Sequence, residues 1–152
     1  IAWVRSFSPR FTQEEPQAPF AVPAPVSYSA ESVARGRQLY ETLQCGKCHG
    51  ASGRGDGWAK ADEMKDDEGR VVRARDFTRG IYRSGNTRPD LWRALQTGLY
   101  GTPMPAYEGS AQPEELSHLA NYLLSLERKR GLWYWLSTPP TWHEPGQHRV
   151  AR

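Results

Sequence analysis

Two cysteines and a histidine stand close together near residue 45. They form Cys45-Gly46-Lys47-Cys48-His49, and the 152-residue chain contains no other cysteine. Two thiols one helical turn apart can each add across one of the two vinyl groups on a haem edge, which yields two thioether bonds. The imidazole that follows can then bind the iron as proximal ligand. The spacing therefore predicts covalent haem attachment.

Three other uses of the cysteine pair compete with this interpretation. A disulfide between Cys45 and Cys48 would be strained at that separation. A zinc site would need about four ligands, and the sequence offers neither a second cysteine pair nor a His-x-x-x-His pattern. A thioredoxin-like pair begins a helix after a strand in a βαβ unit, and no such unit is visible. Haem attachment accounts best for all three side chains.

Composition and charge narrow the class of protein. The length suits one domain with extensions, and a hydrophobic content of 38% with a mean hydropathy of −0.75 indicates a soluble protein with a modest core. The formal charge of +3, without a basic stripe among stacking aromatics, argues against nucleic-acid binding. No stretch approaches the roughly 18–20 apolar residues of a membrane span. A buried porphyrin would enlarge such a core.

Helical spacing dominates the middle of the chain, and no segment alternates with the period of a strand. We therefore predict an all-α fold. The first helix starts after Ser29, with Ser32 as the alternative cap, and runs directly into the cysteine motif. A second helix spans about Pro89 to Thr97, and a third opens near Pro113 with acidic residues in its first turn.

Two irregular segments follow the cysteine motif. Residues 50–57, Gly-Ala-Ser-Gly-Arg-Gly-Asp-Gly, predict a flexible loop whose glycines would let the backbone approach a cofactor closely. A phosphate-binding interpretation of this loop is weak, because no strand precedes it and no Gly-Lys-Ser/Thr ends it. Residues 61–68 are strongly charged, which indicates a solvated turn or a short helix.

Composition divides the chain into three parts. Residues 1–28 form an extended linker with a Pro/Ala-rich stretch, residues 29–130 form the helical domain, and residues 131–152 form an extension rich in tryptophan and proline. Residues 1–7 read like residues 120–126 in their order of aromatic, aliphatic and serine side chains. The likeness leaves two interpretations open, which are coincidence and the end of a preceding similar haem domain.

A haem iron held by one histidine needs a second ligand to remain six-coordinate. Met104 lies between two predicted helices in Gly-Thr-Pro-Met-Pro, where prolines restrict the loop, and a thioether suits haem iron. Met64 lies in a charged stretch that is unlikely to enter a haem crevice. His118 sits on the third helix, while His143 and His148 could compete only if the tail folded back. We therefore predict Met104 as the distal ligand.

These motifs together resemble those of class I c-type cytochromes. Gly36 and Tyr40 precede Cys-x-x-Cys-His, Gly-x-Gly-Asp-Gly follows it, and Gly-Thr-Pro-Met-Pro comes before a last amphipathic helix. The resemblance covers about residues 29–128. It implies the class I cytochrome c fold, in which the first and last helices cross at a small glycine and an aromatic, here Gly36 and Tyr40 against Tyr122. It also implies one covalent haem c with iron.

The resemblance has a narrower form and one departure. The linker and the run Arg-Asp-Phe-Thr-Arg-Gly are similar to the C-terminal haem domain of di-haem cytochromes c, which serve as electron-transfer subunits of bacterial respiratory oxidoreductases. Many single-domain members carry a proline shortly after the motif, and its carbonyl accepts from the proximal histidine. Here no proline lies between His49 and Pro89. A backbone carbonyl in the 50–57 loop could replace it, which leaves the hydrogen-bond partner of His49 unassigned.

Arginines crowd the segment before and within the second helix. A planar guanidinium binds both oxygens of a carboxylate, so one or two of them could pair with haem propionates and others could face an acidic partner. A solvated surface is an equally good interpretation of any single arginine. For propionate contact we select Arg75 or Arg83, with Tyr82 or Trp92 as hydrogen-bond donors. The full set is Arg70, Arg73, Arg75, Arg79, Arg83, Arg88 and Arg93.

The predicted function is electron transfer through reversible Fe(III)/Fe(II) change, with His49 and Met104 as iron ligands and no substrate bond broken. The alternative is a haem enzyme or gas sensor with a displaceable distal ligand, and a third possibility is a purely structural domain of a complex. Partners would be redox proteins or other subunits of a respiratory complex. Haem is attached outside the bacterial cytoplasm, so we expect a periplasmic or otherwise extracytoplasmic protein made with a cleaved export signal.

The aromatic extension generates the first testable prediction. Trp133, Tyr134, Trp135 and Trp142 could each contribute about 1.5–3 kcal/mol if fully buried, on this domain or on another subunit. Truncation after Arg130 should leave the haem spectrum unchanged and lower the melting temperature or weaken assembly with a partner. An unaltered melt together with unaltered assembly would show that the extension is dispensable, and a changed low-spin spectrum would bring His143 back as a ligand.

Overall fold

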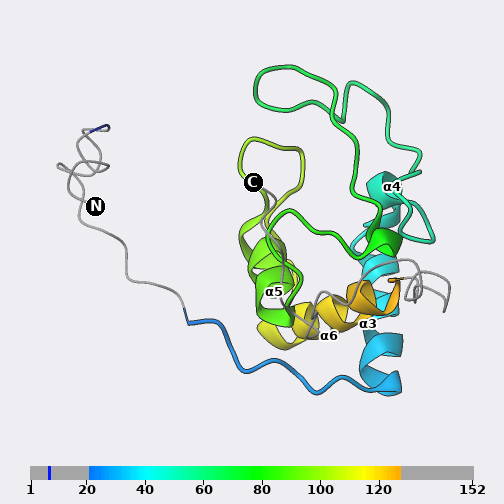
Figure 1. Cartoon of the computed structure of the whole chain (residues 1–152), viewed down its shortest axis with the longest axis vertical. Helices are drawn as coiled ribbons and strands as arrows, with labels where there is room; N and C mark the ends of the chain where they lie inside the picture. Colours follow the sequence, from blue (N-terminus) through cyan, green and yellow to red (C-terminus); the bar gives the residue numbers. More distant parts are fainter. Residues whose placement is uncertain (1–6, 8–20, 128–152) are drawn as a thin grey trace, which may run out of the picture.

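The computed structural model describes Phe7 and residues 21–127, and within these residues the regular elements are helices joined by long loops (Figure 1). Its elements are α3 (Ala30–Thr42), the single-turn α4 (Gly46–His49), the 3₁₀ turn η1 (Phe77–Arg79), α5 (Arg88–Thr97) and α6 (Pro113–Ser125). The described part has no strand, only isolated bridges. The all-α prediction is confirmed. The aromatic extension, the possible repeat in residues 1–7 (apart from Phe7), His143 and His148 lie outside the described residues.

Helix α3 begins where the sequence indicates and ends earlier. The Ser29 side chain accepts a hydrogen bond from the Ser32 amide at 3.1 Å, so Ser29 is the cap. The helix stops at Thr42, and Gln44 adopts a φ of 55°, in the left-handed region. The prediction that the helix runs directly into the cysteine motif was therefore wrong. The break turns the chain, and α4 starts as a separate element.

Helix α5 begins with a capping box, and α6 with half of one. The Thr87 hydroxyl accepts from the Asp90 amide while the Asp90 carboxylate accepts from the Thr87 amide, and in α6 the Glu115 carboxylate accepts from the Gln112 amide at 3.0 Å. Pro89 and Pro113 occupy first-turn positions, where a missing N–H costs no helical hydrogen bond. Both helix starts are thus encoded locally, as the sequence indicates.

The first and last helices cross at Gly36. A Cβ built there would lie 2.1 Å from the His118 carbonyl oxygen and 2.7 Å from the Tyr122 Cβ, so no larger side chain fits. One turn further along α3, the Tyr40 and Tyr122 rings meet edge to face with centroids 5.3 Å apart. The crossing implied by the resemblance is therefore present. It is the closest helix approach seen at any described glycine.

Helix α6 supplies the centre of the core. Leu116, Leu119 and Ala120 have no exposed surface, and α5 packs against this helix through its own apolar face. The buried members of α5 are Leu91, Trp92 and Leu95, each at most 5% exposed. Because α6 contacts both α3 and α5, it fixes the spacing of the two segments that bear the predicted ligands.

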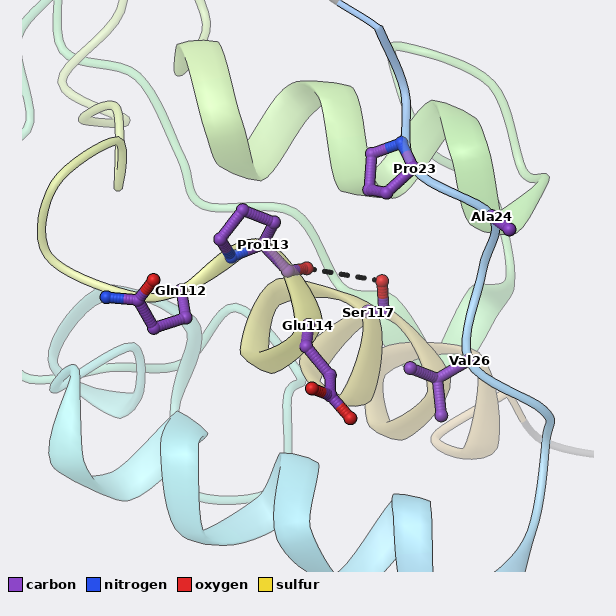
Figure 2. Close-up of a pocket in the computed structure, with 7 residues that line it drawn as sticks. All are labelled: Pro23, Ala24, Val26, Gln112, Pro113, Glu114 and Ser117. Carbon is purple, nitrogen blue, oxygen red and sulfur yellow. Dashed lines mark hydrogen bonds between the residues drawn. The ribbon is translucent and has the colours of Figure 1, made fainter.

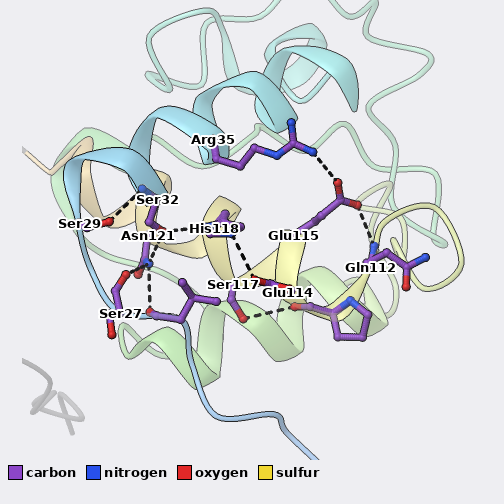
Figure 3. A network of polar contacts seen from close by, with 12 residues as sticks. Ser27, Ser29, Ser32, Arg35, Gln112, Glu114, Glu115, Ser117, His118 and Asn121 are labelled. Atoms are coloured by element: carbon purple, nitrogen blue, oxygen red, sulfur yellow. Dashed lines mark hydrogen bonds and ion pairs between the residues drawn. The ribbon is translucent and has the colours of Figure 1, made fainter.

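The end of the linker is held against the core by polar contacts (Figure 3). Asn121, fully buried on α6, donates to the carbonyls of Val26 and Ser27 at 3.2 and 3.3 Å and to the Ser32 hydroxyl at 2.8 Å. The Arg88 guanidinium also donates to the Val26 carbonyl, at 3.0 Å. The linker therefore enters the domain at a defined place.

A hollow of about 540 Å³ lies between this linker and the start of α6 (Figure 2). Figure 2 shows Pro23 and Ala24 on one side and Pro113 and Ser117 on the other. It contains none of the cysteine, histidine or methionine side chains singled out above. We interpret it as a gap in the packing between the linker and α6 that is separate from the cysteine motif and from Met104.

The helix crossing predicts the effect of a single methyl group. Gly36→Ala should destabilise the domain by about 1–3 kcal/mol, because the added Cβ overlaps the His118 backbone. Thermal or urea unfolding of the haem-loaded chain measures this. Arg37→Ala, on the exposed face of the same helix, is the control and should change stability by less than about 0.5 kcal/mol. Equal stabilities for the two variants would contradict the crossing geometry.

Candidate functional site

The cysteine motif is held by the end of α3. The Cys45 amide donates to the Tyr40 carbonyl at 3.0 Å, and the Tyr40 hydroxyl donates to the Gly50 carbonyl at 2.7 Å. Tyr40 is 2% exposed, and burial raises its pKa, so this hydroxyl remains a donor at neutral pH. Tyr40 thus ties both ends of the motif to the helix crossing.

A backbone carbonyl orients the predicted proximal histidine. His49 Nδ1 lies 3.1 Å from the Arg75 carbonyl oxygen. Because a carbonyl only accepts, Nδ1 carries the proton and Nε2 keeps the lone pair that a metal requires. Burial lowers the pKa of His49, which favours the neutral, ligating form, although the bond to Arg75 opposes the shift. The hydrogen bond to His49 therefore forms without a proline shortly after the motif.

The accepting carbonyl comes from outside the 50–57 loop. The sequence left this partner unassigned with that loop as one possible source, and the structure uses Arg75. The reason lies at Phe77, whose amide donates to the Gly53 carbonyl at 2.7 Å and whose ring stacks on the His49 imidazole with centroids 4.2 Å apart. Burial of Phe77 brings residues 75–77 alongside the imidazole. The sequence analysis did not identify Phe77 as a site residue, although Phe77 lies within the Arg-Asp-Phe-Thr-Arg-Gly run.

The glycines of the 50–57 loop approach protein backbone. A Cβ at Gly57 would lie 2.2 Å from the Lys47 carbonyl oxygen, and one at Gly55 would lie 2.5 Å from the Ala74 carbonyl oxygen. Gly55 also has a φ of 74°. These glycines let the loop fold back onto the cysteine motif and onto the segment before η1. Their role as a close approach to a cofactor stays a prediction.

The two cysteine thiols differ in environment, and both are free. Cys45 is 8% exposed, and burial raises the pKa of its thiol to about 11. Cys48 is only partly buried. The Tyr107 hydroxyl lies 3.9 Å from Cys45 Sγ. Since Tyr107 comes three residues after Met104, this contact brings the methionine loop to the cysteine motif.

The loop around Met104 is fixed by its own backbone. The Met104 amide donates to the Thr102 hydroxyl at 3.3 Å, and its carbonyl accepts from the Leu99 amide at 3.2 Å. Gly98 closes the loop at a φ of 69°, where a Cβ would lie 2.8 Å from the Met104 carbonyl oxygen. Met104 itself is half-buried and packs against the core. Thr102 is a positioning residue that sequence reasoning missed, although it belongs to the Gly-Thr-Pro-Met-Pro motif.

The two described competing ligands have surroundings of a different kind, although Glu63, next to Met64, pairs with Lys47 of the cysteine motif. Met64 belongs to the hairpin of residues 64–72, where its carbonyl accepts from the Val72 amide at 2.7 Å. His118 Nδ1 lies 2.8 Å from the Ser32 hydroxyl, at the crossing of α3 and α6 (Figure 3). His118 is thus engaged on the linker side of the domain, while Met104 packs against the cluster that contains Cys45.

The residues predicted for propionate contact occupy two environments. The side chains of Arg75 and Arg83 are exposed. The Tyr82 hydroxyl donates to the Leu123 carbonyl at 2.9 Å, and the Trp92 indole donates to the Pro113 carbonyl at 2.8 Å. Each of these two groups has a single proton, which here goes to a backbone carbonyl of α6. The geometry therefore gives Tyr82 and Trp92 packing roles, and propionate contact by the arginines stays a prediction.

The donor set fits a covalently attached haem. Two free thiols and an imidazole with an available Nε2 share one turn of helix, and a thioether stands in a braced loop beside them. Within residues 21–127, three or more His, Cys, Asp or Glu side chains never gather as they would around a bare metal ion.

The Tyr40 hydroxyl provides a test that does not depend on the absorption spectrum of the haem. Tyr40→Phe removes one of the two donors to the buried Gly50 carbonyl, leaving the Gly53 amide, and should destabilise the domain by about 0.5–1.5 kcal/mol. Urea unfolding of the haem-loaded protein measures the loss. Tyr28→Phe removes the hydroxyl of a tyrosine that is 56% exposed, and it should have no measurable effect. A neutral Tyr40→Phe variant would argue that the motif is held by other contacts.

Comparisons with known proteins agree with this site. A chain of the Kuenenia stuttgartiensis reducing HAO-like protein complex Kustc0457/Kustc0458 has a similar structure, with a TM-score of 0.75 and 37% sequence identity. The similarity covers 82% of this chain and 57% of that one, and a search of curated proteins found no match. No described helix is long and apolar enough to cross a membrane. The family model described as "Cytochrome c" matches residues 33–127, more than half of the sequence, and the chain therefore belongs to the cytochrome c family.

Proposed function

We propose that this chain is a one-haem electron carrier in which Cys45 and Cys48 hold the haem and His49 and Met104 bind its iron. Membership of the cytochrome c family already implies electron transfer with a c-type haem. The ligand assignment rests on one observation above all. Tyr107 joins the Met104 loop to Cys45, and Met104 packs against the buried cluster that contains Cys45.

The residues of this chain are suited to a haem iron that changes its oxidation state while no bond to a substrate is made or broken. When bound, a haem supplies the reversible Fe(III)/Fe(II) couple. The Arg75 carbonyl holds the proton on Nδ1 of His49, and the Phe77 ring limits rotation of that imidazole. Thr102 and Leu99 hold the Met104 backbone from both sides. If these restrained residues bind the iron, they would keep reorganisation small, which is what an electron carrier requires and a substrate-binding haem does not.

We further propose that the domain works within an assembly of redox proteins. The similar chain comes from a complex of two proteins, and this chain spans 57% of its length. The exposed guanidinium groups of Arg75 and Arg83 offer a contact for an acidic partner surface. We also propose that a similar haem domain precedes this one and that the protein assembles with respiratory subunits. We propose in addition that it lies outside the cytoplasm.

The ligand assignment predicts a contrast between the two methionines. Met104→Ala should abolish the near-infrared thioether-to-iron band of the oxidised protein and leave a high-spin or ligand-accessible haem. Met64→Ala should change neither, since Met64 belongs to the charged hairpin. Absorption spectra of the two variants provide the measurement. A larger effect of Met64→Ala would refute the assignment, and a wild-type protein without the band would favour the alternative of a haem enzyme or gas sensor.

Attachment is checked independently of ligation. The haem should remain with the polypeptide after acid–acetone extraction, because two thioether bonds link it to Cys45 and Cys48. Cys45→Ser with Cys48→Ser should release it. Haem that is extracted from the unaltered protein would refute covalent attachment while leaving the methionine assignment to its own test.

A further inference from the structure

Residues 58–72, which we call the strap, join the two ligand-bearing parts of the domain. The strap starts at the cysteine motif, where the Ala59 amide donates to the Lys47 carbonyl at 2.9 Å and Lys47 forms an ion pair with Glu63. Figure 1 shows this green segment looping out beyond α4 and beyond the loop that follows α5. Its first part is thus anchored to the attachment helix.

The tip of the strap is a tight turn organised by Asp66. One carboxylate oxygen of Asp66 accepts from the Glu68 amide at 3.0 Å and from the Arg70 amide at 2.8 Å, and the other accepts from Arg70 Nε at 2.8 Å. The Asp66 amide also donates to the Arg70 carbonyl at 2.9 Å. The Arg70 backbone amide, followed by its guanidinium, lowers the pKa of Asp66, so the carboxylate is charged at neutral pH. A single side chain therefore determines the shape of the turn.

The tip reaches the Met104 loop. The Asp67 amide donates to the Gly101 carbonyl at 3.4 Å. Gly101 stands between Leu99 and Thr102, the two residues whose backbone and side chain hold Met104. The Thr102 amide and hydroxyl both donate to the Leu99 carbonyl, at 3.1 and 2.7 Å. A displacement at Gly101 is therefore transmitted to the groups that hold Met104.

We propose that the strap positions the Met104 loop relative to the cysteine motif, with Asp66 as the positioning residue at its tip. The strap resists release of the Met104 thioether because it ties Gly101, through the Asp66 turn and Glu63, back to Lys47 on the attachment helix. This inference rests on the proposed His49/Met104 ligation. It assigns a function to a charged segment that would otherwise be a solvated surface loop.

Exogenous imidazole measures how readily the thioether is displaced from the oxidised, haem-loaded full chain. Asp66→Ala removes the oxygen that accepts from both turn amides and should tighten apparent imidazole binding about five- to tenfold, the effect of losing one to two hydrogen bonds. The Leu99 amide, which donates to the Met104 carbonyl, should exchange its hydrogen faster by a similar factor. General loss of stability alone would not select this amide.

Two variants act as matched controls. Asp66→Asn keeps an oxygen for the two turn amides and loses only the ion pair with an exposed Arg70, so imidazole binding should change less than about twofold. Glu68→Gln removes the other partner of Arg70, at 70% exposure, and should behave likewise. If both controls match Asp66→Ala, charge and not turn geometry is responsible, and the proposal fails.

A fourth variant covers the case in which Asp66→Ala does not fold. Gly69 has a φ of 79° and open space beyond its Cα, so Gly69→Ala strains the turn without removing a contact. It should tighten imidazole binding about fivefold. Wild-type affinity in a folded Asp66→Ala or Gly69→Ala protein overturns the strap alone. Absence of the thioether band in the unaltered protein overturns the ligand assignment and the strap together.

Discussion

The crossing of α3 and α6 at Gly36 is the constraint from which the site follows. At this point the two helices approach closely enough that a methyl group would overlap the His118 backbone. The approach brings Tyr40 against Tyr122 and leaves the Tyr40 hydroxyl directed at the Gly50 carbonyl. The attachment motif is therefore positioned by helix packing and not by its own short helix, which is too brief to be stable alone.

The two side chains that we propose as iron ligands are oriented mainly by backbone groups. The Arg75 carbonyl sets the tautomer of His49, and the Leu99 amide restrains Met104, with help from the Thr102 hydroxyl. Backbone groups suit this purpose because they cannot change rotamer or ionise. This also explains how the chain does without a proline after its motif. Any residue held in place by the burial of Phe77 could supply the carbonyl.

Much of the fold could be predicted because its signals are local. The caps at Ser29 and Thr87, the first-turn prolines of α5 and α6, and the apolar stripe of α6 each depend on residues within one or two turns. The attachment motif is equally local, since one helical turn determines the separation of its thiols. The end of α3 could not be predicted, because Gln44 adopts a left-handed conformation that only the packing of Tyr40 and Cys45 requires.

The sequence by itself determined the family, the all-α class and the residue types that could bind a haem, because motif spacing and helix periodicity are properties of short segments. Tertiary structure decided what holds those residues. Arg75 meets His49 across 26 positions of sequence, and Tyr107 meets Cys45 across 62. Likewise, Tyr82 and Trp92 direct their protons at carbonyls of α6. Such pairings depend on which distant backbone carbonyls become buried beside these side chains. A local sequence pattern contains no information about that packing.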